Sequence, residues 1–267
     1  MTTAAMADAS QNTSTQVVRP VSRCCRDRFY AKQRLDSVLP PRPDDASTPL
    51  PRRCPMRSGH VAPPPWSERL ADGVVQSVNV VLAAAGCVVL GVLGGVHADP
   101  RRLVALTAYG VGLLAMVGAS ALYAWARGGR RHRLYRHLDH AAIFLMIAGT
   151  YTPFALISFD GVYGRRLLAL IWAAALAGVL LKLIAPRCAE PISVPLYLIM
   201  GWAGLSNPGL LLSLPAPVVV LLIAGGIFYT IGILFHVARV RFQEAIWHCF
   251  VLVAATCHYV AVLYVVA

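Results

Sequence analysis

Charged side chains are scarce in this sequence. Asp, Glu, Lys and Arg make up only 13% of its 267 residues, while 57% are hydrophobic and the mean hydropathy is +0.61. Soluble domains carry about 25% charged residues. The composition therefore excludes an ordinary soluble protein and predicts an integral membrane protein.

The sequence has no Cys-X-X-Cys pair and few acidic residues. Seven cysteines are scattered along the chain without a Cys-X-X-Cys pair, which argues against a disulfide framework and a thiolate zinc cluster. Twelve acids stand against 24 bases, for a net charge of +12. Because the bases gather in the first 65 residues and in short loops, we expect membrane lipid as the partner, with nucleic acid the weaker alternative.

The first 65 residues have no apolar periodicity. They are rich in Arg, Pro, Ser and Asp, and they end in Ala62-Pro63-Pro64-Pro65. They contain no apolar run of the roughly 7–15 residues that a secretory signal needs. We therefore expect residues 1–65 to form a disordered basic tail, with an arginine-rich transit peptide as the alternative.

Seven apolar segments follow the tail. Each is near the roughly 20 residues with which a helix crosses about 30 Å of hydrocarbon. They cover residues 74–96, 103–125, 139–157, 166–184, 192–212, 217–235 and 245–266. The sequence therefore predicts an all-α membrane protein, a seven-transmembrane helix bundle over residues 66–267.

The basic residues between these segments predict an orientation. After the first apolar segment, nine Lys and Arg residues lie in loops or at segment ends on the side of the N-terminus, and four lie on the other side. Cytoplasmic loops carry the excess of Lys and Arg. We expect a multi-pass protein of the cell membrane with its N-terminus inside and its C-terminus outside.

One carboxylate, Asp139, stands where the third apolar segment begins, directly after a basic stretch. A carboxylate deep in a membrane costs roughly 2–3 kcal/mol, so it faces the protein interior, water or a cation. Alternatively, it lies at the headgroup level and caps the N-terminus of its helix. Both interpretations stay open from the stretch alone.

The predicted topology brings several polar residues to one depth. The second helix ends near Ala124, the third begins at Asp139, and the seventh begins near Glu244. Glu244 and His248 are four residues apart and so share a helix face, and Ser120 lies one turn from Ala124. Such a group could hold a divalent cation. A buried hydrogen bond between Glu244 and His248 is the alternative.

Three blocks of residues resemble a known family. They are Ser120-Ala121-Leu122-Tyr123, the stretch 138–154 that contains Asp-His-Ala-Ala-Ile, and the stretch 245–252 that contains Ile-Trp-His, followed by His258. Together they look like the hemolysin III family, which belongs with the progestin and adipoQ receptors and more distantly with the alkaline ceramidases. The resemblance covers roughly residues 66–267.

The resemblance implies a zinc site at the cytoplasmic side of a seven-helix bundle. In the family three histidines bind zinc, and a serine and an aspartate lie close to the metal-bound water. Ser120, Asp139 and His248 match that pattern, so Ser120 and Asp139 are the candidate catalytic residues. Ala124 and Glu244 stand where two of the histidines belong. His248 and Glu244 are therefore the candidate metal ligands.

Two classes of function follow from the resemblance. The first is a zinc-dependent hydrolase acting on membrane lipid amides, in which Asp139 would orient or deprotonate a water and Ser120 would hold the polarised oxygen. The second is a non-enzymatic protein, either a receptor-like or lipid-sensing bundle or a pore-forming hemolysin. The alanine at position 124 favours the second class, because a catalytic zinc keeps three protein ligands plus water.

Overall fold

The structure is a computed structural model, and it describes residues 65–96, 99–126, 129–159, 161–238 and 240–266. All but one residue of the predicted tail, 1–65, lie outside the described residues. The helices are α2 (Trp66–Val96), α3 (Pro100–Trp125), α4 (Gly129–Pro153) with a π-helical end (Phe154–Ser158), α5 (Val162–Ile184), α6 (Pro186–Trp202) with a 3-10 end (Ala203–Ser206), the short α7 (Pro208–Leu212), α8 (Ala216–Val237) and α9 (Gln243–Val266).

Seven helices in the described ranges are long and apolar enough to cross a membrane. This confirms the predicted seven-helix, all-α class, while the orientation in the membrane stays a prediction. The helices begin earlier than the apolar runs do. α4 begins at Gly129 rather than at residue 139, because arginine and leucine are good helix formers and continue the helix through the basic stretch.

Two expectations about helix ends are wrong. The alternative in which Asp139 caps the N-terminus of its helix is excluded, because Asp139 lies ten residues inside α4. The predicted segment 192–212 is two helices: α6 begins at Pro186, and Asn207 interrupts the helical conformation before α7. Proline at the first position of α6 and of α7 fits a helix start, since its missing N–H needs no partner there.

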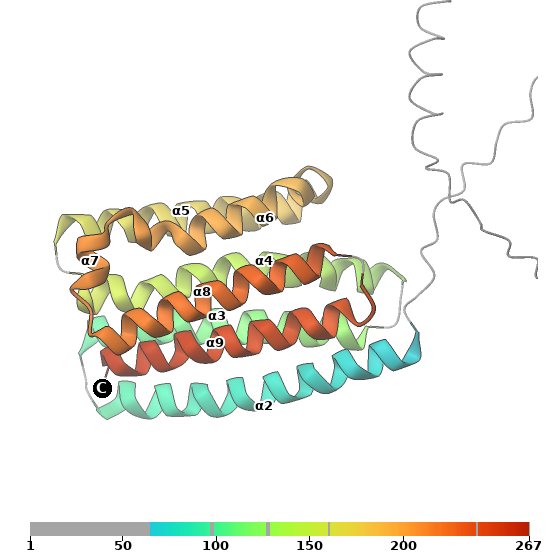
Figure 1. The fold of residues 1–267 in the computed structure, drawn as a ribbon, viewed down its shortest axis with the longest axis horizontal. Helices are drawn as coiled ribbons and strands as arrows, with labels where there is room; N and C mark the ends of the chain where they lie inside the picture. The colour runs from blue at the N-terminus through green and yellow to red at the C-terminus, as the bar shows by residue number, and fades with distance from the viewer. Residues whose placement is uncertain (1–64, 97–98, 127–128, 160, 239, 267) are drawn as a thin grey trace, which may run out of the picture. The chain divides into compact units, whose positions relative to one another are not determined.

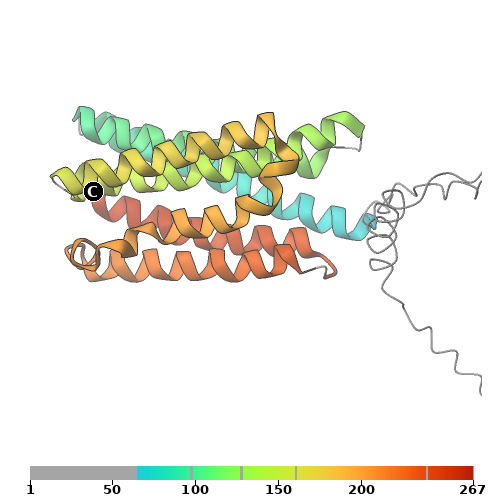
Figure 2. The same ribbon diagram turned by 90° about the horizontal axis from the view of Figure 1, so that it is seen from above.

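The helices form a bundle with α2 at one edge and the α5–α6 pair at the opposite edge (Figures 1 and 2). α3 packs most extensively on α4, and α8 on α9, while α2 covers α3 and α9. A Cβ atom built on Gly149 of α4 would lie 2.8 Å from the carbonyl oxygen of Ala108 in α3, so only glycine permits this approach. Small residues at such crossings are typical of membrane helix pairs.

An ionic cluster joins α4, α5 and α6 at the end of the bundle near Asp139. Lys182 of α5 is 1% exposed, and its Nζ lies 3.1 Å from Oε2 of Glu190 and 3.2 Å from Nδ1 of His140. An ammonium group only donates, so Nδ1 of His140 accepts. The hydroxyl of Tyr197 donates to the backbone carbonyl of His140 at 2.6 Å. The α5–α6 pair is thereby fixed to α4 beside Asp139.

Candidate functional site

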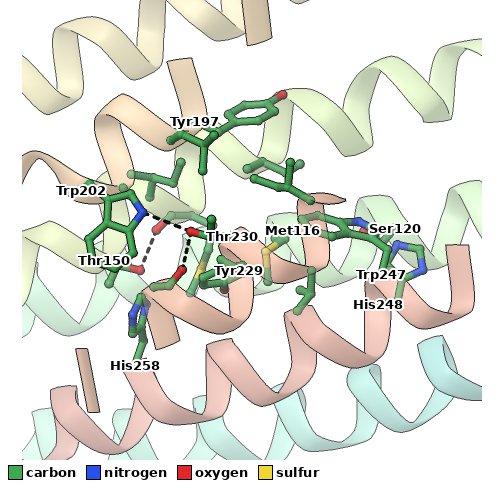
Figure 3. Close-up of a pocket in the computed structure, with 18 of the residues that line it drawn as sticks. Met116, Ser120, Thr150, Tyr197, Trp202, Tyr229, Thr230, Trp247, His248 and His258 are labelled. Atoms are coloured by element: carbon green, nitrogen blue, oxygen red, sulfur yellow. Dashed lines mark hydrogen bonds between the residues drawn. The ribbon is translucent and has the colours of Figure 1, made fainter. Parts of the chain in front are cut away.

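A cavity of about 100 Å³ runs inside the bundle between α3, α4, α6, α8 and α9. Figure 3 shows its lining, with Ser120 and His248 at one end and Trp202 and His258 at the other. His248 and His258 are ten residues apart on α9, which corresponds to about 15 Å along a helix. The cavity is therefore elongated along the bundle, and its two ends differ in chemistry.

At the first end, Ser120 and Asp139 form a direct pair. Ser120 of α3 is buried, and its hydroxyl donates to Oδ1 of Asp139 on α4, which is also buried. Both residues line the cavity, as does His248 of α9. The structure thus brings together three of the four side chains that the sequence singled out. Their proposed roles in catalysis or metal binding stay predictions.

His248 is held by a residue that sequence reasoning missed. Its Nδ1 lies 2.6 Å from Oδ1 of Asp72 on α2, and the two side chains are almost fully buried. A carboxylate accepts, so Nδ1–H donates and Nε2 is left for another partner. Within the described part of the chain, Nε2 has none. An acid directly before the first apolar run, which began at residue 74, was the available signal for Asp72.

Glu244 does not belong to this group. It does not line the cavity, and its Oε2 lies 3.7 Å from Nδ1 of His236, in the last turn of α8. The alternative of a hydrogen bond between Glu244 and His248 is therefore wrong, because each residue pairs with a different partner. The ring of His236 also contacts that of Trp247, with 5.3 Å between the ring centroids.

These residues do not fit the three-histidine zinc site that the resemblance implies. His248 offers Nε2, with Asp72 supporting the ring in the way that carboxylates support metal-bound histidines. Ala124 offers no donor, and Glu244 is engaged with His236. Among the residues that the structure describes, no three His, Cys, Asp or Glu side chains lie in a position to hold one metal ion.

The second end of the cavity is polar without carboxylates. Nε2 of His258 lies 3.3 Å from the carbonyl oxygen of Leu222, so this histidine forms a hydrogen bond between α9 and α8. The indole of Trp202 on α6 donates to Thr230 of α8 at 3.1 Å. The hydroxyl of Tyr229 faces this region and has no hydrogen-bond partner in the described ranges.

Between the two ends, the lining is apolar. Its side chains come from α3, α4, α8 and α9, and they include Met116, Ile143, Met146, Ile233 and Val251. An apolar cavity with a few polar groups at defined points is typical of a site for a small amphipathic ligand. The fold and the cavity define a multi-pass membrane protein with a polar site inside its helix bundle.

The comparisons with known proteins agree with this class. The model of the family described as Haemolysin-III related matches residues 74–259. The chain is 34% identical to Hemolysin-3 of Bacillus cereus over 201 residues, which are 74% of this chain and 92% of that protein. It is 31% identical to a Hemolysin-3 homolog of Bacillus subtilis (strain 168) over 199 residues, 74% of this chain and 93% of that protein.

A more distant relative is the monocyte to macrophage differentiation factor of Homo sapiens. It is 27% identical over 163 residues, which cover 58% of this chain and 67% of that protein. The chain belongs to the haemolysin-III related family. The resemblance that the Asp139 and His248 blocks suggested is thereby confirmed.

Proposed function

We propose that this protein is a lipid-sensing membrane protein that holds a single-chain amphiphile in the cavity between α3, α4, α6, α8 and α9. The observation that carries the proposal is the cavity itself, apolar along its length and polar at both ends. Its apolar part would hold the carbons next to the ligand's end group, with the rest of the acyl chain outside the cavity of about 100 Å³, and one polar end would hold the end group. Asp72 and Asp139 place two carboxyl groups near the first end, which favours a neutral end group that can donate hydrogen bonds over a carboxylate.

A second candidate function is hydrolysis of a membrane lipid amide. The pairs Ser120–Asp139 and His248–Asp72 favour it, because a buried histidine oriented by a carboxylate is a common general base. An amide end group held against Nε2 of His248 would meet both pairs. Zinc binding and lysis, the other predictions from the family, are tested by metal analysis and by leakage of dye-loaded liposomes.

Ligand binding is tested with oleamide, which carries a neutral amide, against oleic acid, which carries a carboxyl group. We expect oleamide to raise the unfolding temperature of the purified protein in detergent more than oleic acid does at equal concentration, because a ligand that binds only the folded state stabilises it. Release of ammonia and oleic acid from oleamide would identify the hydrolase instead.

Two variants of α9 make this test specific. Val251→Phe would fill the lining of the cavity, whereas Val253→Phe places the same ring at a position 43% exposed on the outer face. We expect Val251→Phe to abolish the rise in unfolding temperature with oleamide and Val253→Phe to leave it unchanged. An equal response in both variants would mean that the amphiphile binds elsewhere on the protein.

The three-histidine zinc site of the family pattern allows a separate prediction. Ala124→His combined with Glu244→His restores two histidines at the positions that the family pattern assigns to ligands. We expect the double variant to bind zinc more tightly than the parent, because His248 already presents Nε2 and is held by Asp72. The measurement is zinc per protein after purification and dialysis. A folded double variant with the zinc content of the parent would show that the family geometry is not retained.

A further inference from the structure

The inner face of α2 is polar where a membrane helix is usually apolar. Its buried positions begin with Asp72, Gln76 and Asn79, spaced by four and three residues, while the valines of this helix are mostly on the outside. Gln76 is 0% exposed and Asn79 is 5% exposed. Polar side chains inside a membrane bundle are costly unless they are hydrogen-bonded, so each one needs a partner.

Gln76 and Asn79 form one hydrogen bond with each other, and each side chain keeps one polar atom without a partner among the described residues. Nδ2 of Asn79 donates to Oε1 of Gln76 at 3.3 Å. Neither Nε2 of Gln76 nor Oδ1 of Asn79 has a partner anywhere in the described segments. A buried polar group left in this state destabilises the folded protein. The pair therefore presents one amide donor and one carbonyl acceptor in the interior, close to each other.

This conclusion does not depend on how the two amides are oriented. Exchanging oxygen and nitrogen in both side chains reverses the direction of the bond and again leaves one amide nitrogen and one carbonyl oxygen. Exchanging them in one side chain alone brings two like atoms together. A ligand must therefore accept one hydrogen bond and donate another. A cation would meet the amide nitrogen unfavourably, and an anion would meet the carbonyl oxygen unfavourably.

We propose that Gln76 and Asn79 form a binding site for an internal water molecule inside the helix bundle. The water accepts from Nε2 of Gln76 and donates to Oδ1 of Asn79, which closes a ring of hydrogen bonds with the existing one. Water fits because buried waters bind buried polar groups that lack protein partners. Gln76 is fully buried, and water is a small molecule that can both accept and donate a hydrogen bond there.

The site also bears on the cavity. The water has a second hydrogen, and Asp72 lies one turn from Gln76 on the same face of α2. Asp72 in turn holds His248 of α9. The water thus extends the hydrogen-bond network from Asn79 through Gln76 and Asp72 to the histidine that lines the cavity. In this arrangement Gln76 and Asn79 are positioning residues that support the orientation of His248.

Solid-state NMR of the whole protein in lipid bilayers tests the proposal by transferring polarisation from water to side-chain amides. The Gln76 amide signal is identified by its disappearance in Gln76→Leu. We expect this signal to receive polarisation from water at short mixing times, although the residue is fully buried. In Asn79→Leu the Gln76 signal should receive clearly less of this transfer, because the water loses one of its two acceptors. Ser77→Ala, on the exposed face of α2, should leave the transfer unchanged.

The parent protein alone can overturn the proposal. If the Gln76 amide receives no more polarisation than the backbone amide of Val262, which is 0% exposed, no water is bound there. That result would mean that the two amides pair directly through both of their bonds. Undiminished transfer in a folded Asn79→Leu variant would also overturn the proposal, because the water would then not be bound to Asn79.

Discussion

Glu190→Ala is expected to destabilise the bundle by about 3 kcal/mol, the lower end of the range for removing one partner of a buried ion pair. Lys182 is 1% exposed, and Glu190 is the carboxylate that its Nζ contacts. Without Glu190, the ammonium group stays buried with a neutral histidine as its acceptor. The lower end applies because the side chain of Glu190 is 45% exposed, so water can reach part of the site. The measurement is denaturation of the purified protein in detergent.

The paired variants show whether the buried charge is the cause. Lys182→Met keeps an unbranched apolar chain and leaves Glu190 near Arg136, 3.7 Å away, so its cost should be smaller, about 1 kcal/mol. The double variant Lys182→Met with Glu190→Ala should be more stable than Glu190→Ala alone, since it no longer buries an unpaired ammonium. A double variant as unstable as Glu190→Ala would assign the loss to packing of Glu190 instead.

The same ionic cluster shows what the sequence could not predict. In the sequence, Lys182 is only one of the positive charges that indicate orientation, because its partners come from α4 and α6. Asp72 was missed for a similar reason. It precedes the first apolar run, and only the packing of α2 on α9 brings it to His248. Contacts between helices depend on tilt and rotation, and neither can be read from the hydrophobicity of one segment.

Local patterns, in contrast, were sufficient for the class of fold and for part of the site. Seven apolar runs predicted seven long helices, and the blocks around Ser120, Asp139 and His248 predicted the family and three residues of one cavity end. Glu244 was misplaced because its spacing from His248 suggested a shared site, whereas its partner, His236, lies on α8. Spacing identifies which residues share a face, but it does not identify their partners on other helices.

The contact between α3 and α4 carries the second large prediction, for Gly149→Ala. The new Cβ would lie 2.8 Å from the carbonyl oxygen of Ala108, and this oxygen belongs to the backbone of α3 and cannot move by a side-chain rotation. The two helices must separate, so we expect a loss of about 2–3 kcal/mol, within the range for overpacked cores. Met146 and Thr150, which flank Gly149 on α4, line the cavity, so the response to oleamide should also fall.

Gly118→Ala on α3 is the matched control, because a Cβ there meets no atom within 4 Å. Its stability should be unchanged or slightly raised, as for glycine replaced by alanine in an unstrained helix.

Gly178→Ala tests whether the backbone contact is the reason for the difference between Gly149→Ala and Gly118→Ala. The Cβ at that position would lie 2.5 Å from the ring of Phe144, a side chain that a second substitution can shorten. Phe144→Leu should therefore restore stability to Gly178→Ala, whereas no side-chain substitution in α3 should restore it to Gly149→Ala. Equal stability of Gly149→Ala and Gly118→Ala would show that α3 and α4 do not depend on this close approach.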